Sequence, residues 1–174
     1  MSIAREAQAK AVAASNLHED AEGLKGSYLR LLTLIERLHR QLLDVIKDEL
    51  ERLGQTDINS VQALLLYNIG DAELTAGELR SRGHYLGSNV SYNLKKLVEA
   101  GYIHHQRSDA DRRSVRVSLT SQGREVRDRV SALYNRHMGS IVEVGGVDSA
   151  LIETTNKTLL RLERFWTDQI RFRL

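Results

Sequence analysis

The sequence of 174 residues contains neither cysteine nor proline. Without cysteine the chain can form no disulfide bond, no thiolate metal site and no thiol-based redox sensor. It also lacks any run of about 18 apolar residues, the length that a membrane span needs, and its N-terminus lacks the apolar core of a signal peptide. We therefore expect a cytoplasmic protein that makes no contact with a membrane.

Charge is nearly balanced over the whole chain but is unevenly distributed along it. The net charge is +2, yet the segment from Thr75 to Val117 contains eight Lys and Arg residues against four Asp and Glu residues. A basic segment inside a slightly acidic chain is typical of a protein that binds an anionic polymer. A solvated charged face of a globular domain gives a similar count, and the hydrophobic content of 41% is normal for such a domain.

A long helix with one apolar stripe is predicted near the N-terminus. Its apolar residues recur every three or four positions, which is typical of a helix that buries one face. They are Leu31, Ile35, Leu38, Leu42, Ile46, Leu50 and Leu53. We assign residues 27–56 to this helix, which Gly54 ends, and residues 1–26 to an N-terminal extension that is either a weakly amphipathic helix or a frayed tail.

Residues 57–120 show the pattern of a winged helix-turn-helix. A short apolar helix ends at Gly70, Thr75 and Glu78 form a capping box for a second short helix, and a third helix runs from Ser88 to Ala100. Two alternating strands follow, YIHHQRS and SVRVSL, with a turn between them.

Residues 121–174 add two amphipathic helices, which Gly145 and Gly146 separate, and Asp148 caps the second helix. The predicted fold is mainly α with a small β-wing: a winged helix-turn-helix flanked by long N- and C-terminal dimerisation helices. The small core of the winged helix-turn-helix offers little surface against which long helices can pack. We therefore expect their apolar stripes to pack on each other and on a second copy of the chain, which makes the protein a homodimer.

The third helix of the winged domain is the expected DNA-reading element. A major groove about 12 Å wide admits one α-helix, whose N-terminal residues then face the edges of the bases. Short and aromatic polar side chains near the start of this helix are candidates for base contacts, and two lysines one turn later are candidates for phosphate contacts. They are Ser88, Asn89, Ser91 and Tyr92, followed by Lys95 and Lys96. The alternative is an ordinary solvated helix face.

The turn between the strands, in the stretch SDADRRSVRVS, supplies a second candidate DNA contact. An arginine at the end of a β-ribbon can enter the minor groove, where narrow A·T-rich stretches concentrate negative potential. Asp111 can hold the guanidinium of Arg113 in a bidentate pair before DNA binds. With Arg107 and Arg112, these residues form the predicted wing contact. The alternative is a charged tip that keeps an exposed hairpin from pairing with other strands.

These residues together resemble the MarR family of multiple antibiotic resistance regulators. The resemblance extends over about Ser27 to Ile170 and is most specific in LVEAGYIHHQRSDADRRSVRVSLTSQG, while INSVQALLL is similar to the family's second helix. The matching positions are Leu97, Gly101, Tyr102, Ile103, Asp111, Arg113, Leu119, Thr120 and Gly123. The resemblance implies a homodimeric repressor or activator that binds a palindromic operator in double-stranded DNA. Family members often carry an arginine where this chain has Tyr92.

The same resemblance implies release from DNA by a small aromatic acid or phenol, bound between the dimer helices and the winged domain. Polar groups on otherwise apolar helices are then the candidate ligand contacts: His39, Tyr67, Tyr134 and His137. The alternative for each is a core or interface side chain with a satisfied hydrogen bond.

No cofactor, metal site or enzyme activity is predicted. His104 and His105 point to opposite faces of one strand, and no metal-binding spacing of histidines or carboxylates occurs. The chain has no Gly-rich phosphate loop and no nucleophile elbow. The alternatives to a sequence-specific regulator are a helical scaffold or interaction protein and a non-specific nucleoid-binding protein, and a steep salt dependence of duplex binding separates the scaffold from the DNA-binding proteins.

Overall fold

The computed structural model describes residues 2–75, 77–79, 87–107 and 115–172, and the side chains of residues 22–75, 77–79, 90–106 and 116–172. The chain divides into two compact units, Met1–Val61 and Gln62–Leu174. None of the helices in the described ranges combines the length and the apolar character that crossing a lipid bilayer requires.

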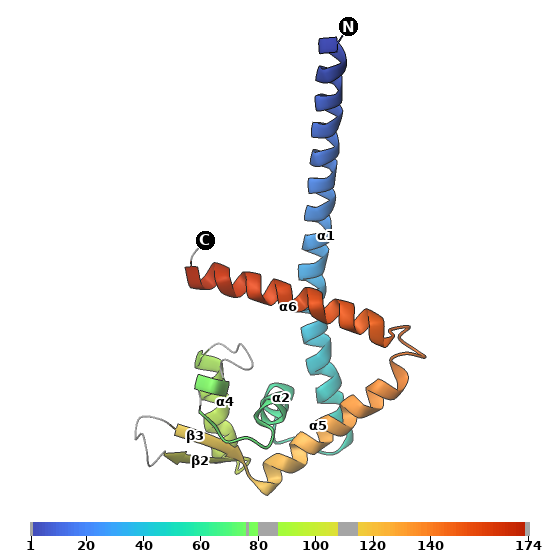
Figure 1. Cartoon of the computed structure of the whole chain (residues 1–174). Helices are drawn as coiled ribbons and strands as arrows, with labels where there is room; N and C mark the ends of the chain where they lie inside the picture. Colours follow the sequence, from blue (N-terminus) through green and yellow to red (C-terminus); the bar gives the residue numbers. More distant parts are fainter. Residues whose placement is uncertain (1, 76, 80–86, 108–114, 173–174) are drawn as a thin grey trace. The chain divides into compact units, whose positions relative to one another are not determined.

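The first unit consists mainly of α1 (Ser2–Arg52), one uninterrupted helix (Figure 1). At a rise of 1.5 Å per residue its length is about 75 Å. Of the two alternatives for the N-terminal extension, the structure has the helix, and no break separates residues 26 and 27. The helix ends where predicted: Gly54 has a φ of +69°, and its N–H donates to the carbonyl of Glu51.

The predicted apolar stripe of α1 is buried only near its C-terminal end. Ile46 and Leu50 are 0% and 3% exposed, as predicted. Leu38 is 60% exposed and Leu53 is 38% exposed, so the single chain leaves part of the predicted stripe uncovered. The spacing of apolar residues shows that a helix has an apolar face, but it does not show what covers that face.

The second unit begins within α2 (Ser60–Ile69), which ends at Gly70 with a φ of +62°. After β1 (Leu74–Thr75) the predicted capping box is present. The Glu78 N–H donates to Thr75 Oγ1 over 3.1 Å, while Glu78 Oε2 accepts from the Thr75 N–H over 2.6 Å. These two bonds satisfy backbone donors at a helix start, which is why the motif could be recognised from sequence.

A small antiparallel sheet has the strand order β1-β3-β2. β2 (Ile103–Arg107) pairs with β3 (Val115–Leu119) in a register that places Ile103 opposite Leu119 and Arg107 opposite Val115. β1 adds only two residues on the other edge of β3, with Leu74 opposite Val117. Sequence reasoning missed β1 because two residues are too few to show an alternating pattern.

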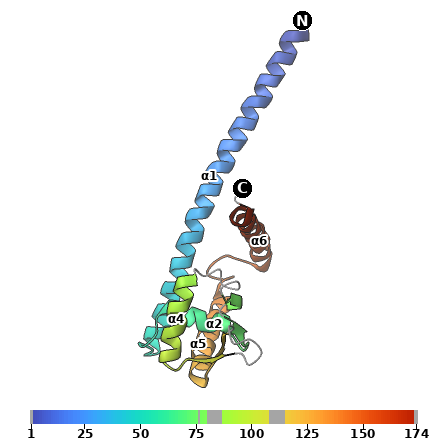
Figure 2. The same ribbon diagram turned by 90° about the vertical axis from the view of Figure 1, so that its left-hand side faces the viewer.

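Two helices complete the chain (Figures 1 and 2). α5 (Ser121–Ser140) buries Val126, Val130 and Leu133, and its Arg127 pairs with Asp71, after α2, over 2.8 Å. α6 (Ser149–Phe172) starts at the predicted cap: the Leu151 N–H donates to Asp148 Oδ1 over 2.8 Å. None of the described side chains of α6 is buried.

The core of the second unit joins α2, the sheet, α5 and α4 (Gly87–Glu99). Its most buried large side chains are Leu65, Leu66, Ile69, Leu79, Val90, Leu97, Tyr102, Val117, Val126 and Val130. The predicted fold class, mainly helical with a small β-wing, is confirmed.

Candidate nucleic-acid interface

The outer face of α4 carries the predicted DNA-reading residues. Val90, Leu94 and Leu97 are 2%, 7% and 0% exposed, so this apolar stripe fixes which side of the helix faces the core. Tyr92 is 63% exposed, and Ser91, Lys95 and Lys96 are exposed as well. Ser88 and Asn89 lie in the first turn of α4, but their side chains are outside the described residues.

An acid that sequence reasoning missed lies beside the two lysines of α4. Glu99 Oε2 is 3.1 Å from Lys96 Nζ, and Glu99 Oε1 is 3.9 Å from Lys95 Nζ. The hydrogen bond from Lys96 to Glu99 raises the pKa of Lys96 above its ordinary value. The i,i+3 and i,i+4 spacings are the signal that could have identified these pairs.

The C-terminal end of α4 is held by a glycine that adopts a left-handed conformation. Gly101 has a φ of +81°, which strains any residue with a Cβ. Its N–H donates to the carbonyl of Val98 over 3.1 Å, and the Tyr102 N–H donates to that of Leu97 over 2.9 Å. The chain thereby turns from α4 directly into β2, and the helix and the wing are joined by a short, hydrogen-bonded connection.

Thr120 connects the base of the wing to α5. Its Oγ1 donates to the carbonyl of Gly101 over 2.8 Å and accepts from the Gly123 N–H over 3.1 Å, while its own N–H donates to the carbonyl of Tyr102. A Cβ on Gly123 would overlap the carbonyl oxygen of Tyr102. Leu119, Thr120 and Gly123, three of the positions that match the family, therefore form a packed junction that fixes the wing relative to the end of α4.

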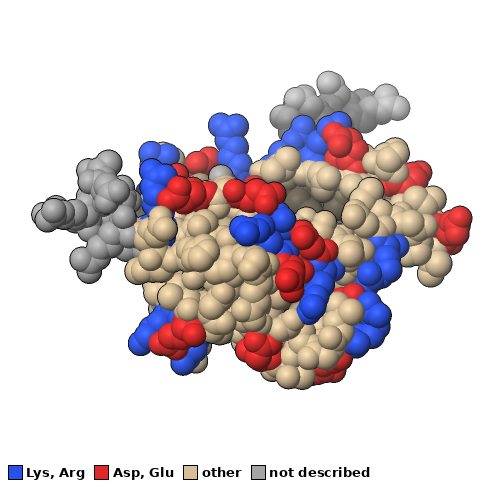
Figure 3. All heavy atoms as spheres, turned by 90° about the horizontal axis from the view of Figure 1, so that it is seen from below, with Lys and Arg blue, Asp and Glu red and all other residues tan. Residues whose placement is uncertain are grey.

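The predicted wing contacts fall mainly outside the described residues. Asp111, Arg112 and Arg113 belong to residues 108–114, between the paired ends of β2 and β3, and the side chain of Arg107 is also outside them. Arg116, on β3, is described, and its Nη1 lies 3.9 Å from Glu73 Oε2. On the face drawn in Figure 3, Lys and Arg side chains lie among Asp and Glu side chains, so no large area of it carries one sign.

Two of the four candidate ligand residues are in contact with each other. Tyr67 of α2 and Tyr134 of α5 are in edge-to-face contact, with ring centroids 5.0 Å apart and an interplanar angle of 84°. His137, in the last turn of α5, is exposed, and so is His39 on α1, in the other compact unit. No cluster of three or more potential metal ligands occurs in the described part of the chain.

Comparisons with known proteins agree on one family. The profile of the MarR family matches residues 56–114. The exopolysaccharide II synthesis transcriptional activator ExpG of Rhizobium meliloti (strain 1021) is 36% identical over 172 residues, which cover 97% of this chain and 87% of that protein.

Solved structures of similar fold come from several organisms. A MarR transcriptional regulator from Methanosarcina mazei Go1 is 25% identical with a TM-score of 0.63, covering 79% of this chain and 96% of that one. Streptococcus pneumoniae FabT in complex with DNA is 24% identical with a TM-score of 0.64, covering 81% and 98%. A mutant of MarR from E. coli, complexed with operator DNA, is 21% identical with a TM-score of 0.63, covering 76% and 92%.

Proposed function

Since this chain belongs to the MarR family of winged-helix transcription regulators, we propose that it acts as a homodimer that binds a palindromic operator in double-stranded DNA. The observation that carries the proposal is the outer face of α4, where Ser91, Tyr92 and Lys95 are exposed while Val90 and Leu94 are buried. FabT and MarR, which share the fold, were solved in complex with DNA. The similarity to a transcriptional activator favours activation over repression.

The dimer is supported by the apolar side chains that the single chain leaves exposed on its first and last helices. Leu24, Leu38 and Leu42 share one side of α1 and are 72%, 60% and 36% exposed. Leu159 and Ile170 share one side of α6 and are 37% and 80% exposed. Apolar surface of this extent is typical of an interaction face. Two protomers related by a two-fold axis present two α4 helices to half-sites about 34–36 Å apart, one turn of the duplex.

The wing supplies the first test of this proposal. Arg113→Ala is expected to weaken binding to an operator selected from random duplex DNA by about 1–3 kcal/mol, because an arginine is lost from the minor groove. Fluorescence anisotropy with a labelled duplex measures the effect, and Arg161→Ala, which changes an exposed arginine on α6, is the control.

Three outcomes would count against the proposal in different ways. Unchanged operator binding by a folded, dimeric Arg113→Ala protein would show that Arg113 of the wing does not contribute to operator binding. Equal affinity of the parent for selected and random duplexes would indicate a non-specific nucleoid-binding protein. Duplex binding without a steep salt dependence would indicate a helical scaffold instead.

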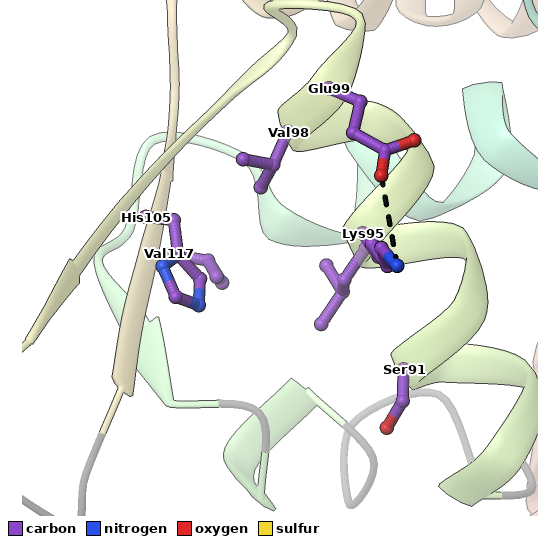
Figure 4. A pocket seen from close by; sticks show the side chains of 7 residues that line it. Ser91, Lys95, Val98, Glu99, His105 and Val117 are labelled. Carbon is purple, nitrogen blue, oxygen red and sulfur yellow. Dashed lines mark ion pairs between the residues drawn. The ribbon is translucent and has the colours of Figure 1, made fainter.

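The ion pairs of α4 give a second prediction. Lys95 and Lys96 are proposed to contact phosphates, and Glu99 lies within ion-pair distance of both; Figure 4 shows its pair with Lys95. Glu99→Gln is therefore expected to tighten binding to any duplex by about two- to fivefold at low salt, because an acid that competes with phosphate is removed. Binding isotherms at several salt concentrations measure it. The matched control is Glu125→Gln, an exposed acid on α5, and an equal gain in both variants would show only a net-charge effect.

We also propose that a small aromatic or phenolic effector releases the protein from DNA. His39, Tyr67, Tyr134 and His137 remain the candidate contacts from the family resemblance. The mutual contact of Tyr67 and Tyr134 supports a role of these two rings in packing α2 against α5.

A further inference from the structure

A row of large apolar and aromatic side chains along α1 follows a strict repeat of seven residues. Successive members lie alternately four and three positions apart, and they are Leu24, Tyr28, Leu31, Ile35, Leu38, Leu42 and Val45. A straight α-helix has 3.6 residues per turn and drifts away from such a repeat, so a face with this period fits a second helix that winds around it. The row therefore indicates a coiled coil over residues 24–45.

The single chain leaves this row open. Leu24 is 72% exposed, Leu38 is 60% exposed and Val45 is 36% exposed. The row ends where α1 becomes buried in its own chain: the next position of the repeat is Glu49, which is 8% exposed and accepts two hydrogen bonds from Arg52. On the opposite side of the helix the exposed residues are polar: Arg30, Thr33, Arg37, Arg40, Asp44 and Lys47.

A second copy of α1 fits this row better than α6 does. α6 has a row with the same period, formed by Ile152, Leu159 and Trp166. Polar side chains, Thr155 and Gln169, interrupt the positions between its members. A coiled coil needs an apolar side chain at both positions of each repeat, and α1 supplies one at every layer from residue 24 to residue 45.

The residue types favour two parallel helices. Leucine at one position of the repeat, as at Leu31 and Leu38, combined with isoleucine at the other, as at Ile35, is the combination that favours a parallel two-stranded coiled coil. In such a pair every member of the row faces its own copy. The residues that flank the row on one side are Ser27, Leu34 and Gln41, which carry no charge, so like charges do not meet across the pair.

The length of α1 favours the same orientation, in a step that rests on the proposed function. An antiparallel pair that matches Leu24 with Leu42 would place the two copies of Arg52 roughly 55 Å apart, at a rise of 1.5 Å per residue. This distance exceeds the spacing of about 34–36 Å between half-sites. In a parallel pair both C-terminal ends lie at the same end of the coiled coil, about 10 Å apart, and each winged domain continues along the chain from there.

We propose that residues 24–45 of two α1 helices form a parallel, in-register coiled coil, which we call the stalk. The stalk is about 33 Å long and is an interface in addition to the one proposed on α6. Its partner, a second copy of this chain, is that of the proposed homodimer, whereas its register and orientation go beyond that proposal. The N-terminal ends of both copies then lie together, at the end of the stalk away from the winged domains.

The absence of cysteine allows the stalk to be tested in the full chain with single introduced thiols. In a parallel, in-register pair, Leu24→Cys and Leu38→Cys each face their own copy at a distance that a disulfide can span. The matched controls are Arg30→Cys and Arg37→Cys, exposed positions on the opposite side of the helix. Under mild oxidation of dilute protein, disulfide-linked dimers are expected to form about tenfold faster at the two stalk positions.

A mixture of two variants tests the orientation. Leu24→Cys and Leu42→Cys proteins, oxidised together, are expected to link each to its own kind, and mass spectrometry of the linked dimers distinguishes the products. Links mainly between position 24 and position 42 would overturn the parallel orientation. Equal rates at stalk and control positions would show random collisions and overturn the coiled coil.

Sedimentation velocity and duplex binding separate this inference from the proposed function. A protein that sediments as a dimer without self-linking at positions 24 and 38 refutes the stalk alone. If Leu24→Cys protein links to itself but binds no duplex, reduced or oxidised, the proposed function fails and the stalk stands. We expect the linked dimer to bind the selected operator at least as tightly as the reduced protein. Loss of binding on linking would show that the DNA-bound dimer does not contain the stalk.

Discussion

Gly123→Ala is expected to lower the free energy of unfolding by about 2–4 kcal/mol, as overpacking against rigid backbone does. The added methyl would overlap the carbonyl oxygen of Tyr102 and press on Leu119. Neither the start of β2 nor the start of α5 can move alone, because the backbone of Thr120 is bonded to Tyr102 and its side chain to Gly101 and Gly123. Alanine normally gains up to about 1 kcal/mol over glycine in a helix, and here the overlap outweighs that gain.

Gly139→Ala is the matched control, because Gly139 lies in the same helix and an added Cβ meets nothing within 4 Å. It is expected to raise stability by about 0.5–1 kcal/mol through helix propensity alone. Urea unfolding followed by circular dichroism measures both variants. A Gly123→Ala protein as stable as the parent would show that the junction between wing and α5 adjusts freely.

Leu159→Glu is expected to raise the dimer dissociation constant by about 100-fold, because an unpaired charge in an apolar interface costs several kcal/mol. Leu159 lies on the apolar side of α6 and is 37% exposed in the single chain. Operator affinity should fall by a similar factor at protein concentrations below the new dissociation constant, since one protomer reaches only one half-site. Sedimentation velocity and duplex binding measure the two effects.

Thr154→Glu is the control for that variant, since it adds the same charge at an exposed position of α6, away from the row that contains Ile152, Leu159 and Trp166. It should leave the dimer intact. If Leu159→Glu also sediments as a dimer, the apolar face of α6 is not part of the proposed interface.

Local signals in the sequence predicted the structure well. The capping box of Thr75 and Glu78, the cap at Asp148 and the glycine after α1 are all confirmed, because each depends on hydrogen bonds or backbone angles within a few residues. The apolar face of α4 is confirmed for the same reason: a period of 3.6 residues determines which side chains share a face.

Features that depend on distant segments could not be predicted in the same way. β1 exists only because β3 lies beside it. The spacing of apolar residues correctly predicted that α1 is a helix. The exposure of Leu38 depends instead on which part of the protein covers it. At the candidate site, the exposed face of α4 was predicted, whereas the position of Glu99 between two lysines was overlooked.

The shared carboxylate of Glu99 has a consequence for how such a protein searches a genome. Attraction to the phosphate backbone is the same at every sequence, so partial neutralisation of the two lysines that we propose as phosphate contacts would shorten each stay at an unrelated site. Contacts with base edges are not affected, and because cognate and random duplexes share the phosphate contacts, the ratio between the two affinities stays the same. A carboxylate that lowers the overall affinity can thus speed the exchange between sites on a chromosome without changing the preference for a particular sequence.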